Sequence, residues 1–513
     1  MNGNRKGQTA VILRIVAAAV VVIAEFTLII SMYLYLRYYA VVIYLVLQVI
    51  LTASILFMVT DSKDESYTIA WLVVVAILPG LGFVLYALWG RPGTAGKGRK
   101  NRRLKKSMEY SQQFFESNDG INEELAREHG QIKTVSRYLD KKGFPIYKNT
   151  RCSYFPLGEL QFDAMIEDFE QAERFIFIEY FILNAGRLWD RISEVLYRKA
   201  AEGVEIRIMF DDFGSLMNLP DRMIQELADR GIKALRYNPI HEATARLYVN
   251  YRNHQKIVVI DGKIAYTGGT NLSDEYANLY EKHGHWKDTA IRMVGDAVWS
   301  MTIIFLQMWD GETGKTSDYL SYKAERRELR ASGFFQPFAD GPNNNPDNPA
   351  ETMYRTLIAN ARDYVYITTP YLIITKAMSE TLCIAAESGV DVRIITPKIW
   401  DHWYVHAVTR SNYRSLLKSG VRIYEYTPGY IHAKMIVSDN NMITGSINMD
   451  YRSFYLHFEN GVWIYDAPVL KEIKEDILRT MDVSEEITLE KYQKRPWYVH
   501  MVERTIRIFE VLL

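Results

Sequence analysis

The chain has 513 residues, of which 61 are Lys or Arg and 61 are Asp or Glu, so its formal net charge is zero. A neutral chain is not expected to bind nucleic acid electrostatically as a whole molecule. Only two cysteines occur, Cys152 and Cys383, which excludes a disulfide framework and argues against a cysteine-based metal site. The length suggests about three folding units.

The first ninety residues are unusually apolar. Three apolar runs cover residues 10–36, 38–59 and 67–89. Each has the roughly 20 residues that a helix needs to cross a bilayer core. Glu25 lies within the first run, where an acid is costly, so two spans and three spans both remain open. We interpret residues 1–90 as an uncleaved transmembrane anchor.

A basic segment follows the anchor. Residues 91–106 contain eight Lys or Arg and no acid, whereas residues 61–66 are net acidic. The positive-inside rule therefore predicts a multi-pass protein of the cell membrane whose remaining domains are cytoplasmic. The segment either binds anionic lipid headgroups or only sets the topology. Residues 91–150 are interpreted as a basic linker and helical lead-in.

From about residue 150 the sequence repeats itself. The strand-like run 175–182 is matched by 364–372, and the paired runs that follow are 202–208 with 388–394 and 231–236 with 420–424. Alternating apolar strands and amphipathic helices are typical of an α/β fold with a parallel or mixed sheet. We expect two fused α/β domains, at 151–335 and 336–485, and an amphipathic tail at 486–513. The first copy has extra residues at 237–252, a candidate loop near an active site.

Each copy carries the same polar pattern, H-x-K-x-x-x-x-D followed by G-[GS]-x-N. The residues are His254, Lys256, Asp261 and Asn271 in the first copy, and His432, Lys434, Asp439 and Asn448 in the second. On a strand, residues two apart project from one face, so each His and Lys point together into a site. An Asn amide there is able to donate to a phosphoryl oxygen.

Each of these residues alone has an ordinary structural explanation: a packed histidine, a solvated lysine or a turn-forming aspartate. Two intact copies at matched spacing favour a shared chemical role instead. Metal binding is disfavoured, because a protonated lysine cannot ligate and the carboxylates do not cluster at ligand spacing.

Over residues 130–485 the chain resembles the phospholipase D superfamily. The resemblance implies two α/β/α sandwich domains related by a pseudo-two-fold axis, with one active site between them. One histidine would attack phosphorus and the other would protonate the leaving alcohol. His254 is the expected nucleophile and His432 the expected acid, although the sequence allows the reverse. Lys256, Lys434, Asn271 and Asn448 would hold the phosphoryl oxygens.

The resemblance also implies an acid that orients each catalytic histidine, 25–35 residues downstream. Asp288 and Glu459 occupy suitable positions, the alternative being that they are ordinary surface acids. Asp261 and Asp439 belong to the catalytic motif, but we expect them to support the fold of the site rather than contact substrate.

The N-terminal runs, the basic linker and the segments 429–434 and 445–453 resemble bacterial cardiolipin synthases in particular. The implied reaction joins two phosphatidylglycerol molecules into cardiolipin and glycerol, with no metal or nucleotide cofactor. Expected partners are phosphatidylglycerol and anionic membrane lipids. A phospholipase D hydrolase, a transferase that uses another alcohol and a non-catalytic membrane scaffold remain alternatives. The tail departs from the family at Phe509-Glu510-Val511, and no feature indicates an oligomeric state.

Overall fold

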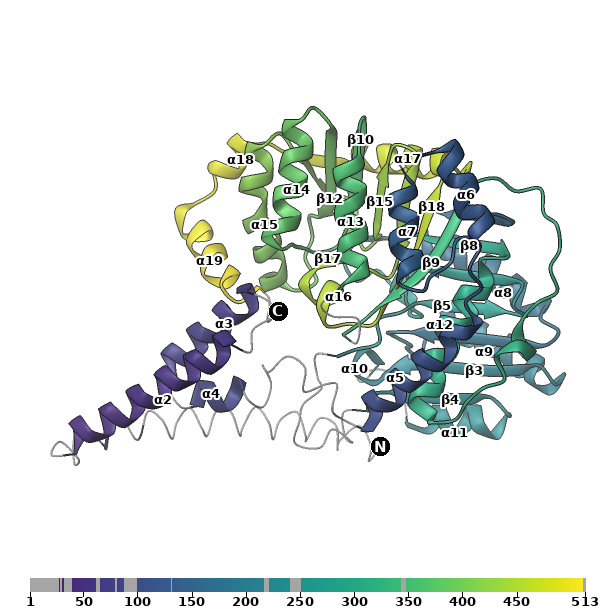
Figure 1. Ribbon diagram of the computed structural model, residues 1–513, viewed down its shortest axis with the longest axis horizontal. Coiled ribbons are helices and arrows are strands. Elements are labelled where there is room, and N and C mark those ends of the chain that lie inside the picture. Colours follow the sequence, from purple (N-terminus) through teal and green to yellow (C-terminus); the bar gives the residue numbers. More distant parts are fainter. Residues whose placement is uncertain are drawn as a thin grey trace.

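The computed structural model describes residues 27, 30–31, 39–60, 65–78, 81–86, 99–130, 132–215, 221–239, 251–342 and 347–510. Nearly all of the first apolar run, residues 91–98 of the basic segment and most of the 237–252 loop lie outside the described residues. Residues 150–487 contain two large mixed sheets, drawn in teal and in green to yellow in Figure 1.

The first sheet has seven strands in the order β1-β8-β6-β5-β2-β3-β4. The strands β2, β3 and β4 are parallel, and the other pairs are antiparallel. Their bounds are β1 (Thr150–Phe155), β2 (Phe175–Tyr180), β3 (Glu205–Asp211), β4 (Lys233–Tyr237), β5 (Ile257–Ile260), β6 (Ile264–Gly268) and β8 (Ala290–Gly295).

The second sheet has eight strands in the order β19-β13-β12-β10-β15-β16-β18-β9. Its six inner strands follow the order of β4-β3-β2-β5-β6-β8, so the predicted duplication of an α/β domain is confirmed. Their bounds are β9 (Phe334–Asp340), β10 (Tyr364–Thr368), β12 (Asp391–Pro397), β13 (Arg422–Tyr426), β15 (Met435–Ser438), β16 (Asn441–Gly445), β18 (Glu459–Tyr465) and β19 (Ser484–Ile487).

Helices cover both faces of the sheets because the central strands are apolar on both sides. In β2, Ile176 and Ile178 pack into one core, while Phe175 and Phe177 face a second core that continues into the other domain. The helices of the first domain are α8 (Gly158–Glu170), α9 (Arg187–Ala201), α10 (Asp212–Ser215), α11 (Asp221–Asp229) and α12 (Val298–Thr313). Those of the second are α13 (Pro349–Asn360), α14 (Lys376–Glu387), α15 (Trp403–Lys418), α16 (Tyr451–Tyr455) and α17 (Val469–Asp482).

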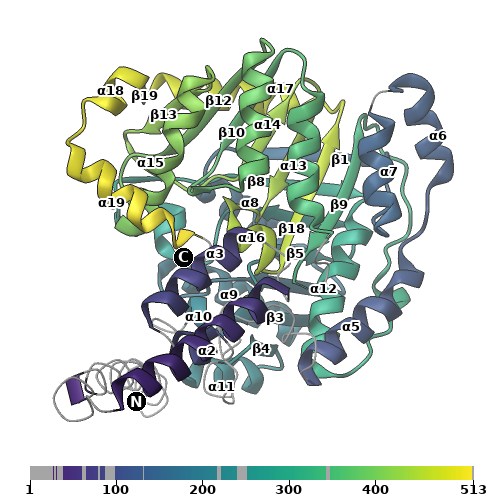
Figure 2. The same cartoon turned by 60° about the vertical axis from the view of Figure 1, so that its left-hand side comes forward.

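The segments outside the two sheets pack around them. The lead-in helix α5 (Arg99–Ser111) lies on α12, where Ser107 Oγ donates to the carbonyl of Gln307 over 2.9 Å. The helices α6 (Asp119–Glu128) and α7 (Lys133–Lys141) follow it. The tail forms α18 (Leu489–Gln493) and α19 (Trp497–Arg507), which ends beside α3 and α16 in Figures 1 and 2.

The N-terminal part contains α2 (Ala40–Thr60), α3 (Glu65–Ile77) and α4 (Leu81–Leu85). Tyr67 of α3 stacks on Tyr451 of α16, with ring centroids 6.1 Å apart. Within the described ranges, no helix was found that is both long and apolar enough to cross a membrane. The transmembrane anchor therefore stays a prediction.

Two short parallel pairings join the domains to one another. The strand β14 (Gly429–Ile431) pairs with β7 (His285–Lys287), and Asn253 forms an isolated bridge with Phe458. Each pairing places the segment that leads to one copy's histidine beside the segment that leads to the other copy's acid. These reciprocal contacts are what a two-fold relation between the copies produces.

The β7–β14 pairing depends on a glycine. A Cβ atom on Gly429 would lie 2.2 Å from the carbonyl oxygen of His285, and backbone cannot yield to such a contact cheaply. Gly429→Ala is expected to destabilise the protein by about 1–3 kcal/mol, measured by urea unfolding. Gly120→Ala is the matched control, because a Cβ atom there meets nothing within 4 Å. Equal stability of the two variants would contradict the proposed role of Gly429.

Candidate active site

The two copies meet at a cavity of about 550 Å³. His254 and Asn271 of the first copy and His432 and Asn448 of the second line it together, so the structure brings both predicted motifs to one site. Both histidines are buried and end loops that run in extended form before β5 and β15. Aromatic residues such as Phe181, Trp286 and Tyr371 share the cavity wall with charged side chains, among them Arg252, Lys282 and Asp401.

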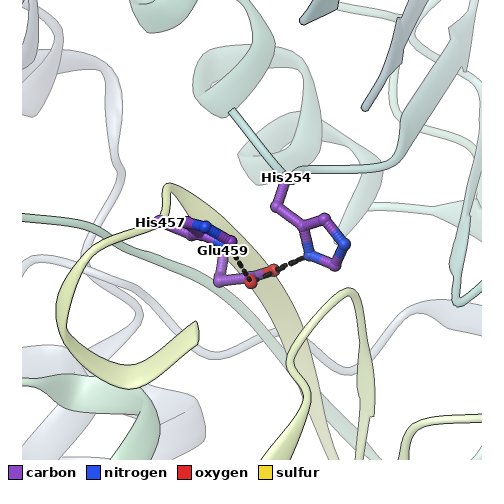
Figure 3. A group of neighbouring side chains, drawn as sticks. All are labelled: His254, His457 and Glu459. Atoms are coloured by element: carbon purple, nitrogen blue, oxygen red, sulfur yellow. Dashed lines mark hydrogen bonds and ion pairs between the residues drawn. The ribbon is translucent and has the colours of Figure 1, made fainter. Parts of the chain in front are cut away.

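Each histidine is paired with an acid of the other copy. His254 Nδ1 lies 2.9 Å from Glu459 Oε1, and His432 Nδ1 lies 2.6 Å from Asp288 Oδ2. Figure 3 shows the first of these pairs. Both carboxylates are fully buried. Because a carboxylate only accepts, each Nδ1 carries the proton and Nε2 of each ring carries the lone pair.

Backbone hydrogen bonds fix these crossed pairs. The amide of His254 donates to the carbonyl of Phe458 over 2.9 Å, and the amide of His432 donates to the carbonyl of Lys287 over 2.8 Å. The acids are therefore placed by the inter-domain strand pairings. The sequence resemblance implied an acid downstream of each histidine that orients it. In the structure, each of these acids contacts the histidine of the other copy.

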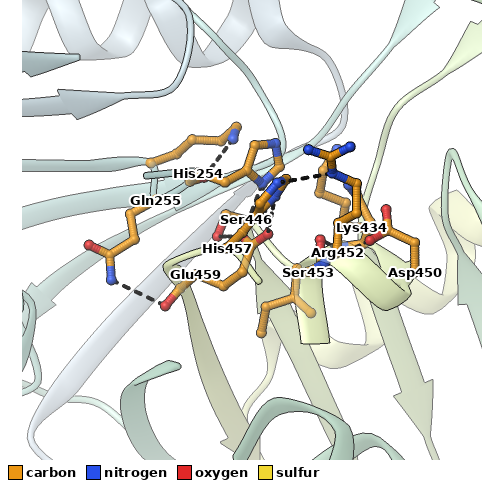
Figure 4. A network of polar contacts seen from close by, with 12 residues as sticks. His254, Gln255, Lys434, Ser446, Asp450, Arg452, Ser453, His457 and Glu459 are labelled. Atoms are coloured by element: carbon orange, nitrogen blue, oxygen red, sulfur yellow. Dashed lines mark hydrogen bonds and ion pairs between the residues drawn. The ribbon is translucent and has the colours of Figure 1, made fainter. Parts of the chain in front are cut away.

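The two acids differ in their surroundings. Ser446 donates a short hydrogen bond to Glu459, and His457 Nδ1 lies 3.8 Å from the same carboxylate (Figure 4). Gly269 occupies the position equivalent to Ser446, and a Cβ atom there would lie 2.0 Å from Asp288 Oδ1. Asp288 instead accepts from the amide of Thr289 over 2.8 Å. The two histidine–acid pairs are thus arranged symmetrically, but the polar contacts of the two acids differ.

The motif lysines lie beside their histidines but do not line the cavity described above. Lys256 Nζ donates to the carbonyl of His254 over 2.8 Å, and Lys434 Nζ lies 3.2 Å from His432 Nε2. Burial lowers the pKa of Lys256 to about 7 and that of Lys434 to about 8. An arriving phosphate anion would favour the charged form of both.

Burial and the neighbouring lysines also lower the pKa values of the histidines. The pKa of His254 falls well below its usual range through burial, with Lys256 and Lys434 adding to the effect. The pKa of His432 falls to about 4 through burial and Lys434, against an opposing contribution from Asp288. Without substrate, both imidazoles are therefore neutral at pH 7.

The two asparagines are also part of the cavity wall. Asn271 Oδ1 accepts from the amide of Ile182 over 3.2 Å, which orients its side chain. Asn448 Oδ1 is buried and has no hydrogen-bond partner among the described residues. Amide groups in these positions suit recognition of phosphoryl oxygens or lipid hydroxyls.

The motif aspartates do not reach the cavity. Asp261 accepts from the backbone amides of Glu173, Arg174 and Phe175 over 2.8–2.9 Å. Asp439 accepts from those of Arg362, Asp363 and Tyr364 in the same way. Both hold the start of the central strand in their own sheet, and these contacts fit the structural role expected from the sequence.

One group of side chains has the spacing of metal ligands. Potential ligand atoms of His254, His457 and Glu459 all lie within 4.8 Å of one another. The buried cations Lys256 and Lys434 lower the pKa of His254, and Arg452 donates to His457 Nε2 over 3.3 Å. Cations this close oppose a further cation and favour a phosphate.

Several cavity residues were not singled out from the sequence. Arg452 lies in the run 445–453, whose resemblance to the family indicates no role for this arginine. Asp401 forms an ion pair with His402 over 3.1 Å and accepts a short hydrogen bond from Tyr371. Arg452 lies on α16, whereas Tyr371, Asp401 and His402 lie in loops between elements, and no sequence spacing marks these residues as part of a site.

Comparison with known proteins agrees with this geometry. The family model described as "Cardiolipin synthase, PLD-like domain" matches residues 165–285 and 354–481, and one described as "Phospholipase D-nuclease N-terminal" matches residues 46–91. Cardiolipin synthase 2 of Bacillus anthracis is 34% identical over 463 residues, covering 88% of each chain. A cardiolipin synthase of Halalkalibacterium halodurans is 32% identical over 460 residues, covering 88% of this chain and 90% of the relative.

Among solved structures, phosphatidylserine synthase of Haemophilus influenzae superposes with a TM-score of 0.57 at 15% identity. The match covers 74% of this chain and 99% of that one, and it shows a shared fold. The duplicated motif, the crossed acid–histidine pairs and the full-length relatives agree. The chain belongs to the cardiolipin synthase family, within the phospholipase D superfamily.

Proposed function

We propose that the protein is a cardiolipin synthase that transfers a phosphatidyl group between two phosphatidylglycerol molecules. The observation that carries this function is the single cavity in which both motif histidines are neutral, paired with buried acids and flanked by buried lysines. Membership in the cardiolipin synthase family identifies the substrate class. The chemistry follows from these residues.

In the first step, His254 Nε2 attacks phosphorus and the bond from phosphorus to the glycerol oxygen breaks. His432 donates a proton to that oxygen, so glycerol leaves neutral. Lys434 lies next to His432 and opposes its protonation. The negative charge of the bound phosphodiester favours the protonated form, so His432 is able to carry this proton. Asp288 supports the imidazolium, Asn271 and Asn448 of the cavity wall hold the phosphoryl oxygens, and the charges of the two buried lysines beside the histidines stabilise them.

In the second step, a headgroup hydroxyl of another phosphatidylglycerol attacks the phosphatidyl-histidine. His432 takes the proton of this hydroxyl, the bond from phosphorus to His254 breaks, and cardiolipin forms. One phosphodiester replaces another, so no nucleotide is consumed. The aromatic wall supports transfer over hydrolysis because it limits access of water to the intermediate.

We further propose that residues 1–90 anchor the enzyme in the cell membrane with both catalytic domains on the cytoplasmic side. The charge-free run 38–59 and the basic residues of 91–106 support this orientation. Exposed apolar side chains on α2, including Val41, Val49 and Leu56, are consistent with a lipid environment.

The proposed reaction is tested by incubating the purified protein with phosphatidylglycerol in mixed micelles and quantifying lipids and free glycerol. Cardiolipin and glycerol should appear in equal amounts, and His254→Ala and His432→Ala should each lower the rate by about 10³-fold or more. Formation of phosphatidic acid without cardiolipin would make the enzyme a hydrolase. No turnover would contradict the proposed substrate.

The roles of the histidines are separated by a substrate whose leaving group needs no proton. Phosphatidyl-p-nitrophenol releases a stable phenolate, so His432→Ala should still release nitrophenol and accumulate a phosphorylated protein. His254→Ala should do neither. Mass spectrometry after rapid quenching locates the phosphatidyl group, and labelling of His432 in the His254→Ala variant would reverse the assignment.

The lysines predict an alkaline limit to activity. Because burial places the pKa of Lys256 at about 7 and that of Lys434 at about 8, both ammonium groups are lost as pH rises above these values. The ratio kcat/KM should therefore fall with rising pH in this range. The fall in kcat should come at higher pH, since bound phosphate holds the protons. A profile of kcat/KM that stays flat to about pH 10 would contradict this account.

A further inference from the structure

A second cavity, of about 630 Å³, lies beside the C-terminal helix α19. Its wall is formed by α19 together with residues of α15 and α18, and we call it the tail groove. Six of its residues carry the argument: Arg414, Tyr492, Trp497, Met501, Arg504 and Ile508. It does not share a lining residue with the catalytic cavity.

The tail groove is positively charged. Among the described residues that line it, none is acidic. Neighbouring arginines are neutralised: Arg410 makes two hydrogen bonds of 2.9 and 2.7 Å to Glu425, and Arg495 makes two of 2.7 and 3.0 Å to Glu503. Arg414 and Arg504 are exposed, and neither has an ion-pair partner within the described part of the chain.

Exposed apolar side chains lie next to these charges. Trp497, Met501 and Ile508 are 75%, 53% and 45% exposed and follow one another at helical spacing along the groove. A helix with tryptophan and methionine on one stripe and arginine beside it is typical of a segment that lies in the headgroup region of a bilayer. A soluble anion would account for the arginines but not for this apolar stripe.

The tail also reaches the catalytic cavity. Glu510, just beyond α19, lines that cavity, and so does Tyr451, whose ring stacks on Tyr67 of α3. In Figures 1 and 2 the end of α19 lies beside α3 and α16. The segment that forms the tail groove therefore also contributes a residue to the catalytic cavity, whose wall contacts α3 through Tyr451.

We propose that the tail groove binds an anionic phospholipid of the bilayer surface. The phosphate lies between Arg414 and Arg504, and the acyl chains lie along Trp497, Met501 and Ile508. A lipid bound there holds the two catalytic domains against the membrane that supplies their substrates. The groove is separate from the catalytic cavity, so this binding does not depend on the proposed reaction.

The test uses the full chain in phosphatidylcholine nanodiscs that contain increasing fractions of brominated phosphatidylserine, which quenches tryptophan fluorescence on contact. Subtracting the signal of Trp497→Phe isolates the quenching of Trp497 from that of the other tryptophans. Half-maximal quenching of Trp497 should need a larger fraction of the anionic lipid in Arg414→Gln and Arg504→Gln, by about fivefold for each arginine.

The matched control is Lys471→Gln with Arg479→Gln, two exposed cations on α17, which should behave as the unaltered chain. Equal quenching of Trp497 by brominated phosphatidylserine and brominated phosphatidylcholine would overturn the proposal. So would displacement of the lipid by free inorganic phosphate, which would identify a soluble-anion site. Because fluorescence is the readout, the result stands whether or not cardiolipin is formed.

Discussion

The catalytic site depends on two pairs in which a histidine of one domain is held by an acid of the other. His254 is held by Glu459 and His432 by Asp288, and both contacts are fixed by backbone pairing across the interface. A buried imidazole without its acid would lose both its orientation and the selection of one tautomer. Neither motif histidine takes its acid from its own domain, so the relative position of the domains is part of the chemistry.

The same interface concentrates positive charge where water is excluded. Two lysines and an arginine lie around two histidines, and burial raises the cost of each charge. This cost lowers the pKa values of the lysines and histidines. A phosphodiester relieves it, since one anion interacts with several cations at once. The cost of burying these cations therefore favours the binding of a phosphate anion.

Much of the fold was predictable because its signals are local. Apolar strands, amphipathic helices and the doubled motif are periodic patterns, and the two sheets follow them strand by strand. The structural role expected of Asp261 and Asp439 fits their contacts, although the amides that they bind are 87 and 77 positions away in the sequence. The pairing of Asp288 with His432 was not predictable in this way, because it joins residues 144 positions apart through an inter-domain strand. Arg452 was missed because no spacing relates it to either motif.

The crossed pairs also set an order of events during synthesis. His254 leaves the ribosome long before Glu459, so the nascent first domain carries an imidazole with no acid to orient it. In the proposed mechanism, His254 is oriented for attack only when β18 joins the second sheet and brings Glu459 to the interface. In the proposed mechanism, a chain that ends before Glu459 therefore carries its nucleophile without the acid that orients it.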